Sequence, residues 1–319
     1  MSPKPTITAV ICTFRRYDRL ENALESLFAQ TLEPERRRVL IVDNAPLTEG
    51  AAARAVAGYS GSLEVDVITE PKPGLSHARN AALRACSSDL IAYLDDDAIA
   101  AATWLSSLVR VFEEERGVAV AGGRVSPIWE SSRPKWLSNR LLGYLSLVDW
   151  AENRMEIVPP RWLAGTNIAY AAGPLRAIGG FRTDLGRRGN ILLSNEELST
   201  CEALRAAGYR VMYEPSARVE HLIPSERLTR SWFRQRAFWQ AVSDVLMDNG
   251  QSEAVLNSPQ ELARYSVGVS GGLPNLLNFG VDHDQSGLCL LQMQALYETT
   301  VHLAHGRVQQ PKASQVSVA

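Results

Sequence analysis

An alternation of short β-branched runs with longer amphipathic stretches extends from residue 6 to about 125, and it constrains the fold more than any other feature. Runs typical of buried strands occupy residues 6–12, 38–43, 63–69, 90–95 and 118–125. Apolar side chains at helical spacing occupy residues 19–31, 48–59, 75–87 and 102–115. We therefore predict an open, mostly parallel α/β sheet flanked by helices, with ligands bound beyond the carboxyl ends of its strands.

After residue 125 this alternation is lost. Residues 126–162 are rich in Trp, Pro and Arg and predict an irregular excursion over the sheet, whose tryptophans fit either a sugar site or a cap on the core. Short strands and helices return in residues 163–222. We predict a first domain at residues 1–225, a helical C-terminal extension at 226–306 and a disordered tail at 307–319.

The charge balance and the cysteines restrict the classes of protein to which the chain can belong. The chain has 33 basic and 35 acidic residues, so its net charge of -2 gives no general reason to bind nucleic acid, and we expect no such partner. The 4 cysteines are widely scattered without CxxC spacing, which indicates reduced thiols and a cytoplasmic protein. No run of 18 apolar residues and no signal-peptide pattern occurs, which predicts a soluble protein.

Three consecutive carboxylates, Asp95, Asp96 and Asp97, follow a predicted buried strand. Adjacent like charges raise one another's pKa unless a cation or a hydrogen-bond donor compensates them. Carboxylate oxygens are ligands for Mg²⁺ or Mn²⁺, and a divalent ion on a substrate diphosphate would supply the missing charge. The alternative is a solvated turn or a helix N-cap, because a helical pattern follows.

Two further polar features have the same position relative to predicted strands. Asp43 ends the second strand, where a carboxylate either accepts a hydrogen bond from a nucleobase or ribose or caps the next helix. Arg79 lies in the first turns of the helix that follows Gly74, where it either meets a nucleotide phosphate or is an ordinary surface residue.

The order and spacing of these features resemble those of the family 2 glycosyltransferases of GT-A fold. The resemblance covers roughly residues 6–222 and implies a Rossmann-like sheet, a nucleotide-sugar donor, Mg²⁺ or Mn²⁺, and an inverting transfer to a hydroxyl. It rests on the segments AVICTFRRYDRL, LIVDNA, PGLSHARNAAL, YLDDDA, GTNIAYAAGPLRAIGGF and NEELSTCEALRAAGYRVMYEPSARVEH.

On the donor side, the resemblance assigns roles to residues at the ends of the early strands. Thr13 and Phe14 match the nucleotide-facing end of the first strand, with Phe14 as the base-stacking ring. Asp43 matches the acid that accepts from the base, and Arg79 the nucleotide-contacting arginine. The outer positions of the DxD motif are Asp95 and Asp97: Asp97 matches the metal ligand, and Asp95 or Asp96 the ribose contact.

On the acceptor side, Gly165 and Asn167 match the strand where backbone and amide approach the sugar. His221 matches a residue that in some relatives helps to hold the metal or the diphosphate. Where the family usually has Glu-Asp, this chain has Glu196 and Glu197, so the catalytic base is expected to be Glu197, with Glu196 as the other candidate. The alternative is that the two acids stabilise a helix N-terminus.

Other departures from the family pattern are Cys12, where Pro is common, and Arg15, where Asn is common, and both leave the nucleotide preference open. The extension carries four arginines among aromatic residues, Arg227, Arg230, Arg234 and Arg236. This segment fits either packing against the first domain or contact with an anionic membrane surface, and its apolar spacing also fits a homodimer interface.

The expected function is therefore inverting, metal-dependent transfer of a hexosyl group in surface polysaccharide or glycoconjugate biosynthesis. The donor is a UDP, GDP or dTDP sugar, the acceptor is a glycan, a lipid-linked or a small molecule, and the place is the cytoplasm or the inner face of the membrane. One alternative is a sugar-nucleotide nucleotidyltransferase, but such enzymes have a Gly-rich loop after the first strand, and residues 12–20 contain no glycine. The other is a non-catalytic glycan- or nucleotide-binding protein of the same fold.

Overall fold

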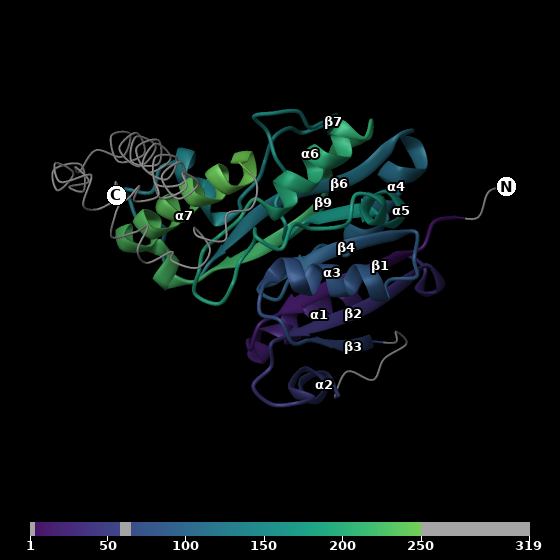
Figure 1. Ribbon diagram of the computed structural model, residues 1–319, viewed down its shortest axis with the longest axis horizontal. Coiled ribbons are helices and arrows are strands. Elements are labelled where there is room, and N and C mark those ends of the chain that lie inside the picture. The colour runs from purple at the N-terminus through teal and green to yellow at the C-terminus, as the bar shows by residue number, and fades with distance from the viewer. Residues whose placement is uncertain (1–3, 58–64, 250–319) are drawn as a thin grey trace, which may run out of the picture.

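The computed structural model describes residues 4–57 and 65–249. Within them the strands form one nine-stranded sheet in the order β3-β2-β1-β4-β8-β6-β9-β5, with β7 paired to β9 (Figure 1). The strands are β1 Ile7–Thr13, β2 Arg37–Asn44, β3 Val65–Glu70, β4 Leu90–Asp95, β5 Ala98–Ala100, β6 Val118–Trp129, β7 Met155–Glu156, β8 Ile168–Ala171 and β9 Arg210–Ile223. The predicted α/β sheet is confirmed, and its five predicted strands correspond to β1, β2, β3, β4 and β6.

The sheet has a parallel part and a mixed part. The neighbours β3, β2, β1 and β4 are parallel, as crossover helices require. Strand β8 is antiparallel to both β4 and β6, while β6 and β9 are parallel to each other. Short β5 pairs antiparallel with β9, which brings the end of β9 next to the residues that follow β4.

Helices cover both faces of the sheet, because successive strand residues point to opposite sides. Ile7, Ala9 and Ile11 of β1 pack with α1, α2 and α4, whereas Val10 packs on the other side with α3, α5 and α6. The helices are α1 Leu20–Phe28, α2 Ala51–Val56, α3 Leu75–Ala85, α4 Trp104–Glu114, α5 Ala172–Ala177, α6 Glu196–Ala206 and α7 Arg230–Asn249, and short 3-10 turns are η1 Tyr17–Arg19, η2 Pro34–Arg36, η3 Asn139–Leu145 and η4 Ser225–Leu228. The core is therefore a helix–sheet–helix sandwich.

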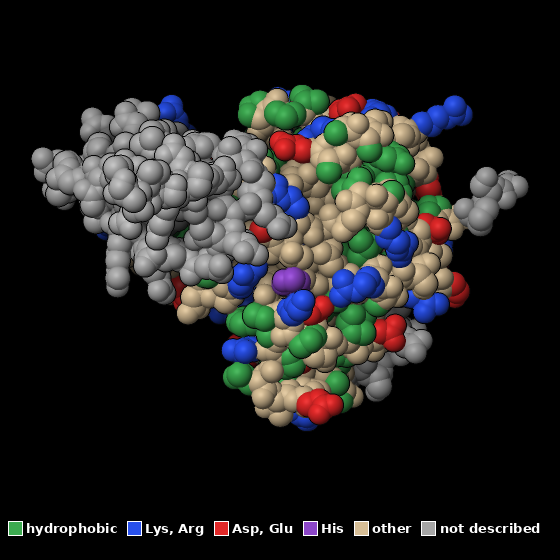
Figure 2. All heavy atoms as spheres, in the orientation of Figure 1, with side chains coloured by type: hydrophobic (Ala, Val, Ile, Leu, Met, Phe, Trp, Pro, Cys, Tyr) green, Lys and Arg blue, Asp and Glu red, His purple; other side chains and the backbone are tan. Residues whose placement is uncertain are grey.

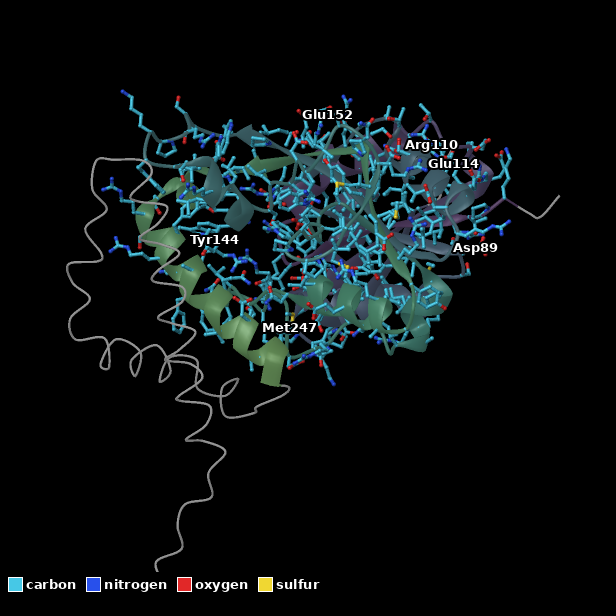
Figure 3. All side chains as sticks on the ribbon, turned by 90° about the horizontal axis from the view of Figure 1, so that it is seen from above. Asp89, Arg110, Glu114, Tyr144, Glu152 and Met247 are labelled. Atoms are coloured by element: carbon cyan, nitrogen blue, oxygen red, sulfur yellow. The ribbon has the colours of Figure 1, made fainter. Side chains whose placement is uncertain are left out.

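The excursion after residue 125 supplies a platform for α7. Leu137, Leu141 and Leu145 pack with Phe233 and Ala237 of α7, and the ring of Trp136 meets Phe233 edge to face with centroids 5.3 Å apart. Figure 3 shows α7 running from the neighbourhood of Tyr144 to Met247. The extension expected at 226–306 is described only as far as residue 249. Its remainder and the expected tail at 307–319 lie outside the described residues.

The tryptophans of the excursion pack largely with one another and with the core. Trp150 donates its indole hydrogen to the carbonyl of Trp162 at 2.7 Å, and the two rings meet edge to face. This arrangement favours the core-capping interpretation over a sugar site. Basic and acidic side chains are interspersed on the described surface in Figure 2. No helix in the described part of the chain is long and apolar enough to cross a membrane.

Candidate active site

The carboxyl ends of the central parallel strands meet at one edge of the sheet. Thr13 at the end of β1 is in register with Asp43 of β2, and Cys12 is in register with Asp95 of β4. The three acids that end β4 therefore lie beside the end of β1. This is the edge at which open α/β sheets bind ligands, as the sequence predicts.

The cation that the three acids require is present in the protein itself as Arg16. Its guanidinium bridges Asp96 and Asp97, with 2.8 Å between Nη1 and Oδ2 of Asp97. Asp96, which is 1% exposed, also accepts a hydrogen bond from Thr13 Oγ1 at 2.8 Å. Burial raises the pKa of Asp96 to about 7 against the opposing charge of Arg16, and the neighbouring Asp97 adds to the rise. Asp96 is thus the inward, structural member of the group.

Asp97 has the opposite electrostatic character. Burial alone would raise its pKa, but contact with His221 and the charges of His221, Arg16 and Arg227 hold that pKa far below its ordinary value. Its Oδ1 lies 3.4 Å from His221 Nε2, and its Oδ2 lies 3.5 Å from Arg227 Nη2. A carboxylate that stays ionised in this way is suited to bind a cation.

His221 reaches Asp97 because of strand pairing. The register of β5 with β9 places Ala98 opposite His221, and Leu222 N donates to the carbonyl of Asp97 at 2.9 Å. The other ring nitrogen, Nδ1, lies 3.1 Å from the carbonyl of Leu145. Since a carbonyl only accepts, Nδ1 carries the hydrogen, and the ring is oriented with Nε2 toward the acids.

The donor set fits a divalent metal ion. One ligand atom each from Asp95, Asp97 and His221 lies within 4.8 Å of the others. Two carboxylates and an imidazole suit Mn²⁺, and the carboxylates suit Mg²⁺. Arg16 and Arg227 contact Oδ2 of Asp97, whereas Oδ1 is the atom turned toward His221. Asp97 and His221, both predicted from sequence to serve the metal, are therefore brought together with Asp95.

The two glutamates begin α6, and one of them is held by Arg79. Nη1 of Arg79 lies 2.8 Å from Glu196 Oε1, and Nη2 donates to the carbonyl of Gly165 at 3.2 Å. Arg79 is 2% exposed, and its guanidinium lies over the rings of Tyr93 and Phe181. Although burial opposes it, the charges of Glu196, Glu197 and Asp95 raise the pKa of Arg79, so the side chain is a permanent cation.

Arg79 is thus a buried residue that positions α6, rather than a surface residue. Its contact with a nucleotide remains a prediction. Only glycine fits at position 165, because a Cβ there would lie 2.5 Å from Nη2 of Arg79. The glycine expected on the acceptor side therefore makes room for the ion pair.

Glu197 differs from its neighbour because no ion pair neutralises it among the described residues. Burial raises the pKa of Glu197 to about 8, the adjacent Glu196 adds to the rise, and Arg79 opposes it. Its Oε2 is buried and has no hydrogen-bond partner within residues 4–57 and 65–249. A carboxylate with such a pKa is suited to accept a proton near neutral pH. Both glutamates also lie in the first turn of α6, where their charge suits the helix dipole.

The residues expected to contact the nucleotide lie at the sheet edge, where their side chains contact other groups of the protein. Asp43 accepts from the hydroxyl of Tyr17 at 2.9 Å and from the amide of Ala52, in the first turn of α2, at 3.1 Å. The alternative that Asp43 caps the next helix is therefore supported by this geometry. Phe14 is half-buried, with the guanidinium of Arg15 4.7 Å from its ring centroid. Contact of either residue with a nucleobase remains a prediction.

Asn167 lies in the core. Its side chain is 0% exposed, accepts from the indole of Trp104 at 2.8 Å and donates to the carbonyls of Arg124 and Ala217. The amide joins α4, β6 and β9, and the acceptor role expected of it has no support in this geometry.

Sequence reasoning missed Arg16 and Arg227 as partners of Asp97. Arg16 follows the first strand directly, and the need for a cation beside three acids was a signal for it. Arg227 lies far along the chain in η4, and local sequence carries no sign that it meets the acids.

Comparison with known proteins gives a consistent result. Residues 8–171 match the profile of the family described as Glycosyl transferase family 2. The chain is 28% identical over 249 residues to the glucosyl-dolichyl phosphate glucuronosyltransferase of Haloferax volcanii, covering 76% of this chain and 77% of that protein. It is 27% identical over 231 residues to the succinoglycan biosynthesis protein ExoM of Rhizobium meliloti, covering 72% and 70%.

Two solved structures share the fold. One is the mannosyltransferase PcManGT from Pyrobaculum calidifontis in complex with GDP-Man and Mn²⁺, with a TM-score of 0.60, 17% identity and coverage of 97% of this chain and 89% of that one. The other is GalNAc-T7 with UDP, GalNAc and Mn²⁺, with a TM-score of 0.55, 16% identity and coverage of 95% and 58%. The fold of the chain is accordingly the GT-A fold.

Proposed function

The chain belongs to glycosyl transferase family 2, and from this premise we propose that it is an inverting, metal-dependent enzyme that moves a sugar from a nucleotide-diphosphate sugar to an acceptor hydroxyl. One observation carries the proposal. Asp95, Asp97 and His221 converge at the carboxyl edge of the sheet, and the charges of both Asp95 and Glu197 act on the buried guanidinium of Arg79. An acid of the cation site and the proposed base therefore both interact electrostatically with the same arginine.

Asp95, Asp97 and His221 would hold the metal ion. A divalent ion bound there neutralises the charge that develops on a diphosphate leaving group. The chain's own residues prepare this site: Leu145 orients the imidazole, and Arg16 and Arg227 keep Asp97 ionised. The relatives of known structure were solved with Mn²⁺, which supports a divalent metal of this kind.

Glu197 is the proposed general base. It takes the proton of an acceptor hydroxyl as that oxygen attacks the anomeric carbon, and attack in line with the departing diphosphate inverts the configuration. Glu196 is the weaker candidate, because its Oε1 is engaged by Arg79. The pair of Arg79 with Glu196 fixes the first turn of α6, and with it the backbone that carries Glu197.

The biological setting is proposed from the relatives. One acts on a dolichyl phosphate-linked glucose and the other takes part in succinoglycan biosynthesis, so we place this chain in glycoconjugate or polysaccharide assembly. Cys12, Cys86 and Cys201 are free thiols, which agrees with a cytoplasmic location. The acceptor is then a glycan, a lipid-linked sugar at the inner face of the membrane or a small molecule.

A thermal-shift screen tests the proposal. UDP-, GDP- and dTDP-sugars are added with and without Mn²⁺ to the wild type and to Asp97→Ala. A ligand specific for the folded state stabilises it by about 2.7 kcal/mol at a hundredfold excess over its dissociation constant. We expect one nucleotide class to stabilise the wild type only with Mn²⁺, and not to stabilise the variant. The absence of any shift would refute the donor site. Product NMR of the anomeric centre then tests inversion.

A further inference from the structure

A buried arginine in α7 forms no ion pair with any described residue. Arg236 is 7% exposed, and its Nη2 donates to Ser194 Oγ at 3.2 Å and to Gln240 Oε1 at 2.7 Å. Its Nε and Nη1 are buried and have no hydrogen-bond partner in the described part of the chain. Enclosing a guanidinium with unsatisfied donors is costly unless a ligand completes it.

A second arginine, Arg187, follows Gly186, whose backbone lies against the first turn of α6: a Cβ at Gly186 would lie 3.2 Å from Cδ of Glu196. Arg187 belongs to the segment after α5, and its carbonyl accepts from Leu75 N at the start of α3 at 2.8 Å. Its guanidinium makes no hydrogen bond or ion pair with any described residue. Burial and, to a smaller extent, the charges of Arg236 and Arg227 lower the pKa of Arg187 to about 9, against the opposing charges of Glu196 and Asp95. The positive charges of Arg187, Arg227 and Arg236 therefore act on one another.

The surrounding acids do not neutralise this group. Arg227 contacts Asp97, but Asp97 is already bridged by Arg16. Glu196 is already paired with Arg79, and Asp244 accepts hydrogen bonds from Asn195 and Gln240. Glu197 acts on Arg236 through its charge without an ion pair, and its pKa of about 8 keeps it largely protonated at neutral pH. Among the described residues, positive charge therefore remains uncompensated between α7 and the first turn of α6. Guanidinium groups bind phosphate oxygens through paired, charge-assisted hydrogen bonds, so a phosphate is the ligand chemistry that this arrangement fits.

The position of Arg236 indicates which substrate brings the phosphate. Its partner Ser194 lies two residues before Glu196, so the arginine is anchored at the end of α6 that carries the proposed base. An acceptor hydroxyl must reach that base. The donor diphosphate, in contrast, is expected at the Asp95–Asp97–His221 cluster.

We propose that Arg187 and Arg236 bind a phosphate group carried by the acceptor, so that this enzyme acts on phosphorylated acceptors. The inference rests on the proposed function, since it places the acceptor at the base. The proposal restricts the acceptors to sugars or glycans that bear a phosphate or diphosphate. Such an acceptor is either a free molecule or attached to a lipid.

Inorganic phosphate and phenyl phosphate serve as probes in a calorimetric titration. The protein is first saturated with Mn²⁺ and the nucleoside diphosphate of the class found in the thermal-shift screen, which fills the donor site. We expect phosphate to bind this complex, and to bind about 10- to 100-fold more weakly to Arg187→Gln and to Arg236→Gln. Arg84→Gln removes an exposed arginine, 68% accessible, and is expected to bind as the wild type does.

The outcomes separate the two claims. Phosphate that binds only the nucleotide-free protein and is displaced by the nucleoside diphosphate would assign the arginines to the donor and overturn the proposal. The proposal is equally overturned if both arginine variants bind phosphate as the wild type does, or if the wild type binds none. Failure of the nucleotide itself to bind contradicts the proposed function, and phosphate is then titrated against the nucleotide-free variants to test the arginines alone.

Because Arg236→Gln removes a buried unpaired charge, its unfolding midpoint is expected to stay at or above that of the wild type.

Discussion

Arg79 and Glu196 form a buried ion pair, with 2.8 Å between Nη1 and Oε1, that joins α3 to the first turn of α6 across 117 residues of sequence. The charges of Asp95, Glu196 and Glu197 all act on Arg79 and raise its pKa. The guanidinium therefore interacts electrostatically both with one acid of the cation site and with the proposed base.

Removal of this arginine tests its structural role. Arg79→Met leaves Glu196 buried without its partner, so we expect the free energy of unfolding to fall by about 3–5 kcal/mol. Urea denaturation measures the loss. Arg84→Met breaks the exposed pair with Glu70 and is expected to cost no more than about 1 kcal/mol. Equal effects of the two substitutions would contradict the account of Arg79.

Arg16 compensates the acids when no metal is bound, and its removal should make the protein more dependent on metal. Arg16→Gln is expected to lower the free energy of unfolding by about 1–2 kcal/mol, less than for a fully buried pair because the side chain is 40% exposed. Mn²⁺ should then raise the melting temperature of the variant by more than it raises that of the wild type. Arg110→Gln on α4 is the control. A smaller Mn²⁺ response in Arg16→Gln would show that Arg16 assists metal binding instead of substituting for it.

Neutralising the proposed base should abolish transfer while leaving the donor site intact. Glu197→Gln is expected to lower kcat by about 10²- to 10⁴-fold, the usual contribution of a general base, with no change in donor affinity. Glu202→Gln, an exposed position of the same helix, is the matched control. In the wild type, kcat/KM should rise with pH up to about 8, since the carboxyl must lose its proton to act. A rate that is independent of pH between 6 and about 9 would exclude this role.

The same pKa predicts a pH-dependent stability difference. The ordinary value for Glu is 4.5, and burial raises that of Glu197 in the folded protein to about 8. The folded state thus holds the proton more tightly than the unfolded state, so the contribution of Glu197 is complete below about 4.5 and is lost as pH rises toward about 8. The Glu197→Gln variant does not lose stability in this way, because glutamine does not titrate. Urea unfolding across this range should show the variant gaining stability relative to the wild type as pH rises, and parallel profiles would contradict the raised pKa.

The fold was predictable from sequence where a local pattern carried it. The β-branched run of residues 6–12 became β1, and the acids at 95–97 ended β4, because side-chain periodicity and the end of a buried strand are local properties. Strand β5 has only 3 residues, too few to give a periodic signal. Its pairing with β9 places His221 at Asp97, and only the resemblance to a family could suggest that contact.

The buried partners of the site residues were not predictable. An arginine near the start of a helix looks the same in sequence whether it faces solvent or the core. Only the packing of α6 onto α3 buries Arg79. The resemblance implies a sugar contact for Asn167, although Trp104, Arg124 and Ala217 occupy its hydrogen-bonding groups. Such pairings join segments far apart in the chain, so composition and spacing do not encode them.

The most direct test of the central claim is a calorimetric titration of Mn²⁺ in the presence of the preferred nucleoside diphosphate. The wild type and Asp66→Asn, a substitution at an exposed position of edge strand β3, are expected to bind Mn²⁺ alike. Asp97→Asn is expected to bind it at least about tenfold more weakly. If Asp97→Asn binds Mn²⁺ and the nucleotide as tightly as the wild type does, the acidic turn is not the metal centre and the proposed mechanism is wrong.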